Sequence, residues 1–584
     1  MNKMQCDILN ILKVNSDISQ RMISKLSCYS LGNVNNIIND LYREGFIDSD
    51  NIVTNKGIRL FNINKPKRAI ILAAGYGMRM VPINMKVPKG ILKVHDECLI
   101  DRIIKQLHEV GIYEIHIVVG YLKEKYEYLI DKYNVDLIVN SEYSTKGSIY
   151  SLKLASKYID NSYIIPCDIW CKNNPFNVNE INSWYMVNNN TSINTDVRVN
   201  RKYELIKISD EEIGNKMIGI AYLNHDDSVI LRDRLSSIII KDNDVHWENI
   251  LYDKDRMFIY ARVVDKDDIL SINTYEDLRD IDSNSNDLES YAIDVIKGAL
   301  NVNGNNIKDI RVLKKGMTNR SFMFSVNDSK YIMRIPGEGT EELINRKEEA
   351  SVYSVIGNRN ICDDIVYINE NNGYKITKYI DNARVCNPFD IDDVKKCINV
   401  LKRFHNMKLK VNHEFDIFRK IDYYENLWNG NKSIYDDYDT TKKNVLSLKE
   451  YIDENVNEKY LTHIDSVPDN FLISNNNDIE EIHLIDWEYA GMQDVHVDIA
   501  MFAIYALYNK TEVDRLIDIY FDSNCDLLTR IKIYCYISCC GLLWSNWCEY
   551  KRNLGVEFGE YSLKQYRFAK DYYNYAIKEM KNLK

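Results

Sequence analysis

The fold of the middle of this chain is decided by the stretch from Arg68 to Val94, RAIILAAGYGMRMVPINMKVPKGILKV. Its residues Ala69–Ala73 have the continuous apolar pattern of a buried strand, and Ala74-Gly75-Tyr76-Gly77 follows directly. Small residues at such a turn let backbone N–H groups approach a polyphosphate closely. Arg79 and Lys89 then add fixed positive charge. The stretch therefore predicts a strand that leads into a phosphate-binding loop.

Strands alternate with helices as far as about Asp282. Strand patterns lie at Ala69–Ala73, Ile115–Gly120, Asp136–Asn140 and Tyr163–Cys167, and a helical pattern lies at Leu99–Val110. This alternation predicts a parallel, Rossmann-like sheet with the phosphate loop at the carboxyl end of a strand. Asp168 ends the last of these strands, where a carboxylate faces the nucleotide and suits Mg²⁺. A turn aspartate that satisfies local backbone groups is the alternative.

The complete string, L-A-A-G-x-G-x-R-M-x-P followed by P-K, resembles the nucleotide-binding signature of the nucleotidyltransferases that activate phosphosugars and phosphocholine. The resemblance implies catalytic roles for Arg79 and Lys89. It also implies a Mg²⁺ ligand at Asp168, and Glu248 is the best match for a second acidic ligand. The nucleotide contacts that it implies are Leu72, Ala73, Ala74, Gly75, Gly77, Asn140 and Ser148, of which the last two could equally be loop residues.

The first 65 residues have the pattern of a small helical unit. Helices are expected around Ile8–Leu12, Gln20–Leu26 and Leu31–Leu41, and a short β-wing follows over residues 45–53, closed by residues 54–57. This order resembles a winged helix-turn-helix module. A DNA reader carries Arg or Lys on its third helix, whereas this third helix offers asparagines and no basic residue before Arg43. We therefore expect an interaction or regulatory role, with DNA binding as the less favoured alternative.

A second set of candidate catalytic residues lies between residues 461 and 488. It reads LTHIDSVPDNF and then HLIDWE, which is H-x-D-x-x-x-x-N followed by an apolar strand that ends in Asp. Phosphoryl transfer needs one carboxylate to receive the hydroxyl proton, and an Asn and an Asp to bind the magnesium ions that bridge the phosphates. Here Asp465 would be the catalytic base, and Asn470 and Asp486 would be the metal ligands.

The residues before this set have a different pattern. A strand at Ile310–Leu313 leads into a glycine turn, a hairpin pairs Ser321–Val326 with Tyr331–Ile335, and a helix is expected at Glu341–Val355. The order resembles a protein-kinase-like fold of the aminoglycoside and choline kinase group. In that group an Arg often replaces the strand lysine of protein kinases.

The resemblance to this kinase group implies roles for individual residues. Arg334 would contact phosphate and Glu349 would be its ion-pair partner, and further nucleotide contacts would be Gly316, Thr318 and Asn319. Ile464 departs from the group, because many relatives have Gly or Asn there, and this leaves the geometry of the catalytic loop open.

Further motifs narrow the group: GMTN at 316–319, RIPG at 334–337, DWEYAG at 486–491 and LWSNW at 543–547. Together they resemble bacterial choline kinases that feed surface-polymer decoration and that work with a CTP:phosphocholine cytidylyltransferase. Some bacteria carry both enzymes in one polypeptide. A quaternary ammonium has no N–H donor, so its pocket should be aromatic with a carboxylate nearby. Trp544, Trp547 and Tyr566 are the candidate substrate residues, and an ordinary core stripe is the open alternative.

The phosphate ester that the middle domain accepts is a separate question. Cytidylyltransferases of this type tend to hold the trimethylammonium group with carboxylates near the end of the domain. Ser271 and Asn273 stand at the positions expected to be acidic. Either aromatic faces such as Trp170 and Trp247 compensate, or the ester preference is altered or relaxed. We favour the second reading.

Composition sets outer limits on the class of protein. The chain has 584 residues, so several domains are expected, and its net charge of −11 argues against a nucleic-acid coat. Its 13 cysteines have no framework spacing and are expected to be reduced thiols. The N-terminus lacks the apolar core of a signal peptide, and the most apolar late run, Ile533–Trp544, is shorter than a membrane span. We expect a cytoplasmic protein without a membrane segment.

Three domains are predicted: a winged helix-turn-helix module at 1–65, a Rossmann-like nucleotidyltransferase at 66–284 and a choline-kinase-like domain at 285–584. The sequence thus predicts a bifunctional enzyme that makes phosphocholine from choline and ATP, and then CDP-choline from phosphocholine and CTP, with Mg²⁺ at both sites. The same reactions on another amino alcohol or a sugar are one alternative. A ligand-sensing, DNA-binding regulator with degenerate catalytic domains is another.

Overall fold

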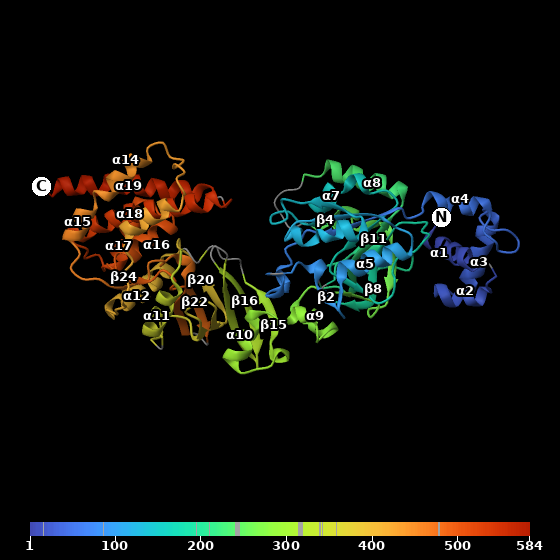
Figure 1. Cartoon of the computed structure of the whole chain (residues 1–584), viewed down its shortest axis with the longest axis horizontal. Coiled ribbons are helices and arrows are strands. Elements are labelled where there is room, and N and C mark those ends of the chain that lie inside the picture. Colours follow the sequence, from blue (N-terminus) through green and yellow to red (C-terminus); the bar gives the residue numbers. More distant parts are fainter. Residues whose placement is uncertain are drawn as a thin grey trace. The chain divides into compact units, whose positions relative to one another are not determined.

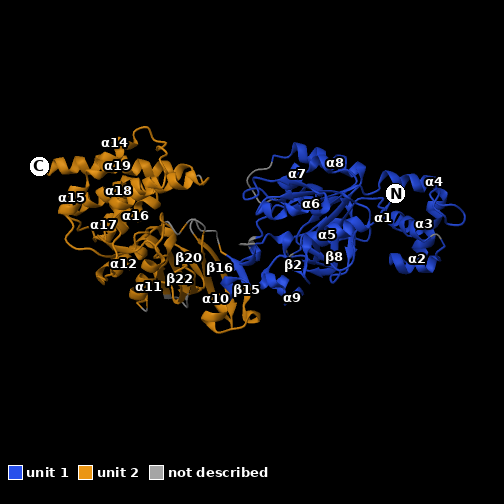
Figure 2. Ribbon diagram, viewed as in Figure 1, with its two compact units in different colours: residues 1–294, 310–312 blue, residues 295–309, 313–584 orange. Residues whose placement is uncertain are grey.

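The computed structural model describes the chain except residues 16, 86, 194, 210, 240–245, 314–318, 338–339, 341–342, 358, 477–478, 557 and 584. It divides into two compact units, residues 1–294 with 310–312, and residues 295–309 with 313–584 (Figure 2). The N-terminal helices and the central sheet belong to the first unit, and the kinase-like region belongs to the second. The domain borders at 65 and 284 remain predictions.

Four helices form the N-terminal region: α1 (Lys3–Val14), α2 (Gln20–Ser27), α3 (Leu31–Arg43) and α4 (Asn55–Ile63). The first three confirm the expected helices. The expected wing is reduced to one antiparallel bridge between Ile47 and Val53. The segment expected to close the wing instead begins α4, because the Thr54 side chain accepts a hydrogen bond from the Gly57 N–H and caps the helix. The winged helix-turn-helix assignment stays a prediction.

A large mixed sheet forms the body of the first unit (Figure 1). β1 (Arg68–Ala73) lies between β4 (Glu114–Val119) and β6 (Ser162–Pro166) and is parallel to both, and β5 (Asp136–Val139) is parallel to β4. These strands, with α5 (Leu99–Glu109), confirm the predicted Rossmann-like half. Parallel strands in this order bring the ends of β1, β4 and β6 to one edge, where the site residues lie.

The sheet continues beyond the predicted parallel strands and is mixed. β11 (Gly214–Leu223) is antiparallel to β6 and to β8 (Trp184–Ser192). Further strands continue the sheet: β9 (Val197–Val199), β10 (Glu204–Lys207), β12 (Tyr252–Asp253) and β13 (Arg256–Val264). β9 and β10 are antiparallel and only four residues separate them, which is too short for the crossover that parallel neighbours need.

The remaining elements of the first unit cover the sheet or join its edges. They are the short hairpin β2 (Lys93–Val94) and β3 (Glu97–Cys98), the pair β7 (Ile169–Cys171) and β14 (Ile269–Ser271), and the helices α6 (Tyr128–Tyr133), α7 (Ser148–Leu154), α8 (His225–Ser237) and α9 (Tyr275–Ile281). One apolar core on each face of the sheet fixes the strand register.

The turn-rich stretch at the predicted domain border is anchored to the first unit. The carboxylates of Asp282 and Asp287 accept hydrogen bonds from the backbone N–H groups of His95 and Lys93, at 2.7 and 2.6 Å. Ser285 Oγ donates to the Lys93 carbonyl. These contacts explain why the first unit continues beyond residue 284, as far as residue 294.

The second unit begins with an antiparallel sheet. β16 (Asn319–Val326) and β17 (Ser329–Pro336) form the predicted hairpin, and β17 continues to β19 (Lys375–Lys378) and β18 (Ile365–Ile368). Asn327 and Asp328 at the hairpin turn both have positive φ, as a tight two-residue turn requires. α11 (Arg346–Ile356) begins five residues later than the sequence predicted, because Asn345 caps it. Before the hairpin stand α10 (Tyr291–Leu300) and β15 (Lys308–Val312).

The catalytic segment of the second unit lies among short strands. β21 (Tyr460–Thr462) pairs with β24 (Gly491–Gln493), and β22 (Phe471–Asn476) pairs with β20 (Ala383–Val385) and β23 (Ile479–Leu484). The helices of this region are α12 (Ile391–Asn406), α13 (Ile417–Asn426), α14 (Tyr438–Leu446), α15 (Lys449–Glu454), α16 (Val497–Tyr505), α17 (Lys510–Tyr520), α18 (Leu527–Asn553) and α19 (Glu560–Asn582).

Helix α18 contains the apolar run that the sequence analysis judged too short for a membrane. Within the described residues it is the one helix that is long and apolar enough to cross a membrane, judged by length and composition alone, and 78% of its apolar window is buried inside the protein. It packs against α16 and α19. A mostly buried helix of this kind is what the core of a globular domain also contains, so it is weak support for a membrane segment.

Candidate active sites

The phosphate loop follows β1 and is shaped by its glycines. Gly77 has a φ of +64°, and a Cβ added there would lie 2.9 Å from Lys89 Cγ, so glycine is required both by the backbone and by the lysine beside it. A Cβ added to Gly75 would have no described atom within 4 Å. Asn84, a buried residue that the sequence analysis missed, donates from Nδ2 to the carbonyls of Tyr76 and Gly77, at 3.2 and 3.1 Å. These two hydrogen bonds hold the backbone of the loop at Tyr76 and Gly77.

The structure brings together the charged residues that were predicted around this loop. Lys89 Nζ lies 2.9 Å from Asp168 Oδ2. Lys89 also donates to Asn273 Oδ1 at 3.1 Å, and Arg79 Nη2 donates to the same oxygen at 3.3 Å. Asn273 comes from a loop after β14, 184 residues from Lys89. Asn273 was predicted from the sequence to lie in the ester pocket, and nothing in its local pattern connects it to Lys89.

Asp168 and Asn273 offer oxygen atoms on either side of Lys89. A carboxylate and an amide oxygen are ligands that Mg²⁺ accepts, with substrate phosphates and water completing the shell. In the described part of the chain, no group of three or more His, Cys, Asp or Glu side chains could hold a metal ion by itself.

Glu248, predicted as the second metal ligand, is hydrogen-bonded to a tyrosine. Its Oε1 accepts a hydrogen bond from Tyr185 at 3.1 Å, and its Oε2 is buried without a hydrogen-bond partner among the described residues. Burial raises the pKa of this carboxyl. No described contact joins Glu248 to Asp168, so its metal role stays a prediction.

The predicted contacts for base and ribose already have protein partners. Asn140 donates to Ser151 Oγ at 3.0 Å and accepts from the Glu142 N–H at 2.9 Å. Ser148 Oγ accepts from the Trp247 N–H at 2.9 Å. These bonds order the loops after β5 and before α7. Any contact of Asn140 or Ser148 with a nucleotide would be added to this framework or exchanged for it.

The two aromatic faces proposed for the ester pocket are covered. Trp247 is buried and packs against Tyr185, with ring centroids 5.9 Å apart. The Arg102 guanidinium lies 4.8 Å from the centroid of the Trp170 ring, and His95 meets the edge of that ring. Arginine on an aromatic face occupies the position that a ligand cation would take.

The kinase-like unit holds its catalytic loop at the end of β21. Asn470 Nδ2 donates to both the backbone carbonyl and Oδ2 of Asp465, at 2.8 and 3.1 Å. Burial, and after it the neighbouring carboxylates of Asp486 and Glu488, together raise the pKa of Asp465 to about 8. The structure thus brings Asp465, Asn470 and Asp486 together as predicted.

The backbone around Asp465 is strained. Ile464 has a φ of +69°, a left-handed conformation that is uncommon for a β-branched residue. The left-handed conformation explains why the resemblance implies Gly or Asn at this position, and Ile464 adopts it at a cost in backbone strain. The strained turn is clamped by Asp498 of α16, whose carboxylate accepts the N–H groups of His463 and Ile464 at 3.0 and 2.7 Å. Asp498 is fully buried, and His405 Nε2 lies 2.9 Å from its Oδ2.

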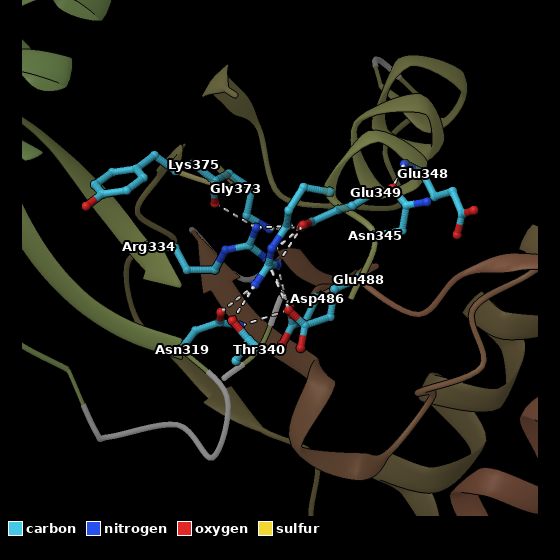
Figure 3. A network of polar contacts seen from close by, with 12 residues as sticks. Asn319, Arg334, Thr340, Asn345, Glu348, Glu349, Gly373, Lys375, Asp486 and Glu488 are labelled. Carbon is cyan, nitrogen blue, oxygen red and sulfur yellow. Dashed lines mark hydrogen bonds and ion pairs between the residues drawn. The ribbon is translucent and has the colours of Figure 1, made fainter. Parts of the chain in front are cut away.

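A buried network of charges lies beside Asp486 (Figure 3). Arg334 forms a double contact with Glu349, from Nη1 at 2.6 Å and from Nη2 at 2.7 Å, and its Nη1 lies 3.5 Å from Asp486 Oδ1. Burial alone would raise the pKa of Glu349, but Arg334 and then Lys375 lower it to about 2. The predicted Arg334–Glu349 pair is confirmed.

Three further residues extend this network. Arg346 Nη1 lies 3.0 Å from Glu349 Oε2 and 3.3 Å from Glu488 Oε2. Asn319 donates to Glu488 Oε2 at 2.9 Å. Burial raises the pKa of Glu488 to about 7, with Asp486 adding to the effect. Gly316 and Thr318, the other predicted nucleotide contacts, lie outside the described residues.

The predicted substrate aromatics are packed within the helical core. Trp544 and Trp547 lie edge to face at 5.4 Å, and Trp544 Nε1 contacts Met501 Sδ. Tyr566 stacks on Tyr435 at 3.8 Å, and its hydroxyl bonds to side chains of the α14 region. All three predicted residues are buried, as the core-stripe alternative expects. Their role in a substrate pocket stays a prediction.

These two geometries define a transferase with two active sites, one for nucleotidyl transfer and one for phosphoryl transfer. Comparison with known families agrees. Residues 310–520 match the Choline/ethanolamine kinase family model, and residues 69–174 match the model of the MobA-like NTP transferase domain. The chain is an enzyme with a kinase domain and a nucleotidyltransferase domain, and the folds predicted for these two domains are confirmed.

Each of the following relatives matches one part of the chain. Choline-phosphate cytidylyltransferase of Streptococcus pneumoniae is 29% identical over 236 residues, which is 37% of this chain and 96% of that protein. Protein LicA of Haemophilus influenzae strain KW20 is 27% identical over 263 residues, 43% of this chain and 96% of that protein. The 2-aminoethylphosphonate cytidylyltransferase of Lancefieldella rimae is 38% identical over 101 residues, 17% of this chain and 41% of that protein.

Proposed function

We propose that this chain makes CDP-choline in two steps: choline and ATP give phosphocholine and ADP in the C-terminal domain, and phosphocholine and CTP give CDP-choline and pyrophosphate in the middle domain. The observation that carries the proposal is that one chain holds both Asp465 with Asn470 and Asp486, and Lys89 with Asp168. A relative named choline-phosphate cytidylyltransferase and a relative named Protein LicA each match over 96% of their own length, which supports the proposal.

In the phosphorylation step, Asp465 receives the proton of the choline hydroxyl as its oxygen bonds to the γ-phosphorus of ATP. The pKa of about 8 belongs to a site without ligands, where neighbouring carboxylates disfavour a further negative charge. A cationic substrate beside Asp465 lowers that pKa and favours the carboxylate that must accept the proton. Asn470 and Asp486 would hold Mg²⁺, which neutralises the phosphate charge when bound.

In the nucleotidyl step, a phosphate oxygen of phosphocholine attacks the α-phosphorus of CTP and pyrophosphate leaves. Lys89 compensates charge on the phosphates, and Gly77 lets the loop backbone lie against its side chain. Arg79 shares the Asn273 oxygen with Lys89, so both cations are held on the same side of the loop. Asp168, with Asn273 beside it, would hold Mg²⁺, which supplies further charge neutralisation.

We further propose that the middle domain has an altered or relaxed ester preference. Ser271 supplies no charge where a carboxylate is expected, Asn273 is engaged by Lys89 and Arg79, and the Trp170 face is covered by Arg102. A relative that shares 38% identity over part of this domain is named for 2-aminoethylphosphonate, which is an amino compound without a quaternary ammonium group.

The test is product analysis by ³¹P NMR with ATP, CTP, Mg²⁺ and a panel of amino alcohols and their phosphate esters. Formation of phosphocholine and then CDP-choline supports the proposal, and another product pair identifies the alternative substrate. Absence of both products would favour the alternative that the chain is a ligand-sensing regulator.

We place the enzyme in the cytoplasm, where ATP and CTP are available. For the N-terminal module we propose an interaction role.

A further inference from the structure

Lys375 is a buried lysine beside the kinase site that neither reaction has used so far. It stands on β19 directly opposite Arg334 on β17, so the two side chains lie on the same face of the sheet. The Lys375 side chain is 5% exposed. A buried ammonium group is costly unless nearby groups compensate its charge, so its partners indicate why it is there.

The partners of Lys375 belong to the helix that carries Glu349. Lys375 Nζ lies 3.7 Å from Glu349 Oε1 (Figure 3). It also donates to the Tyr353 hydroxyl at 2.6 Å. Tyr353 is one helical turn beyond Glu349 on α11. Lys375 therefore contacts both residues on the face of α11 that points to Arg334. Glu349 Oε1 also lies 2.6 Å from Arg334 Nη1, so Lys375 and Arg334 share this oxygen.

Some N–H groups of Arg334 have no hydrogen-bond partner in this arrangement, among the residues that the structure describes. Its Nη2 bonds to Glu349 Oε2 and to the Gly373 carbonyl. Among the described residues, Nε and Nη1 are buried without a partner in hydrogen-bond geometry, although Nη1 lies near the carboxylates of Glu349 and Asp486. A guanidinium has five N–H donors in a fixed fork, and one carboxylate satisfies at most two of them well.

We propose that Lys375 is a positioning residue for ATP binding: by sharing the charge of Glu349 and holding it through Tyr353, it leaves the Arg334 guanidinium free to turn its unused donors to a phosphate of the nucleotide. The inference rests on the proposed kinase activity. Without the ammonium group, the whole charge of Glu349 faces Arg334 and Arg346, and Arg334 is drawn fully into the ion pair.

The experiment replaces Lys375 by Met, which keeps the length of the side chain and removes its charge, in the full-length protein. The matched control is Lys378→Met on the same strand, where the side chain is 61% exposed and pairs with Asp364 at 3.1 Å. ATP affinity is measured by calorimetry with MgATP, and KM is measured separately for ATP and choline. Thermal unfolding reports whether the kinase unit of the variant is folded, and nucleotidyl transfer from CTP is the activity of the unit that carries no substitution.

Lys375→Met should raise the Kd and KM for ATP about tenfold, equivalent to ~1.4 kcal/mol. The KM for choline and the nucleotidyl activity should stay unchanged. Lys375→Arg should restore most of the ATP affinity, and Lys378→Met should match the wild type. Because calorimetry needs no acceptor, a wild type that binds ATP without phosphorylating choline would count against the proposed substrate and leave this inference standing.

Two results would overturn the inference. The first is an unchanged Kd for ATP in a folded Lys375→Met protein. The second is an equal loss of ATP binding, choline phosphorylation and thermal stability that Lys375→Arg fails to restore, since a purely structural lysine would behave in that way. Tyr353→Phe gives an independent measure, because it removes the hydroxyl that holds Lys375 and keeps every charge, and it should weaken ATP binding less than Lys375→Met.

Discussion

Replacing Asp465 by Asn should abolish choline phosphorylation and at the same time stabilise the kinase domain. Asparagine keeps the shape of the side chain and removes the charge that burial and two neighbouring carboxylates disfavour. Because folding raises the pKa of Asp465 from 3.8 to about 8, the folded state binds the proton more tightly than the unfolded chain, and stability falls as the pH rises through that interval.

The size of the stabilisation follows from this interval. Between pH 3.8 and pH 7 the ionisation of Asp465 lowers the free energy of unfolding by about 1.4 kcal/mol for each pH unit. This gives an upper bound of about 4 kcal/mol at pH 7. The Asp465 side chain is half-buried, and solvent screening reduces the expected gain to on the order of 1–2 kcal/mol. In a domain of this size such a gain raises the Tm by roughly 2–8 °C.

The assay is thermal unfolding of ligand-free protein between pH 5 and pH 8, with both activities measured in parallel. The Tm advantage of Asp465→Asn should grow as the pH rises, choline phosphorylation should fall about 10²–10⁴-fold, and added phosphocholine should still be converted. The control is Asp453→Asn on α15, whose side chain is 60% exposed. A Tm equal to or below that of the wild type across this range, or near-normal kinase turnover, would refute the reasoning.

Three other outcomes are expected. Lys89→Ala should abolish pyrophosphate release and spare phosphorylation, with the exposed Lys93→Ala as control; if both activities fell in a folded protein, two independent sites would be the wrong picture. The kcat/KM of the middle domain should not favour phosphocholine strongly over phosphoethanolamine, and Ser271→Glu should increase that preference; strong selectivity that this variant leaves unchanged would place the pocket elsewhere. Fluorescence anisotropy should find no duplex DNA complex tighter than about micromolar at physiological salt, because α3 has no basic residue before Arg43, and a salt-sensitive nanomolar complex would contradict this.

Local patterns made the elements next to the chemistry predictable. The run Ala69–Ala73 and the glycines after it identify β1 and its loop, since an apolar strand followed by a small-residue turn has few other solutions. The hairpin of β16 and β17 was predictable because Asn327 and Asp328 tolerate the left-handed conformation of its turn. The antiparallel pairings of the central sheet were missed, because the direction of a strand is set by the lengths of the connections and not by its own residues.

The sequence by itself determined which reactive groups are present: Lys89 and Asp168 around one loop, and Asp465, Asn470 and Asp486 in one motif. Their spacing is fixed by short segments, so it can be read locally. Only the tertiary structure decided their partners. Asn273 reaches Lys89 across 184 residues, and Lys375 meets Glu349 because β19 pairs with β17 in one register. Such contacts depend on burial and strand pairing between distant segments, and no local pattern of residue types encodes them.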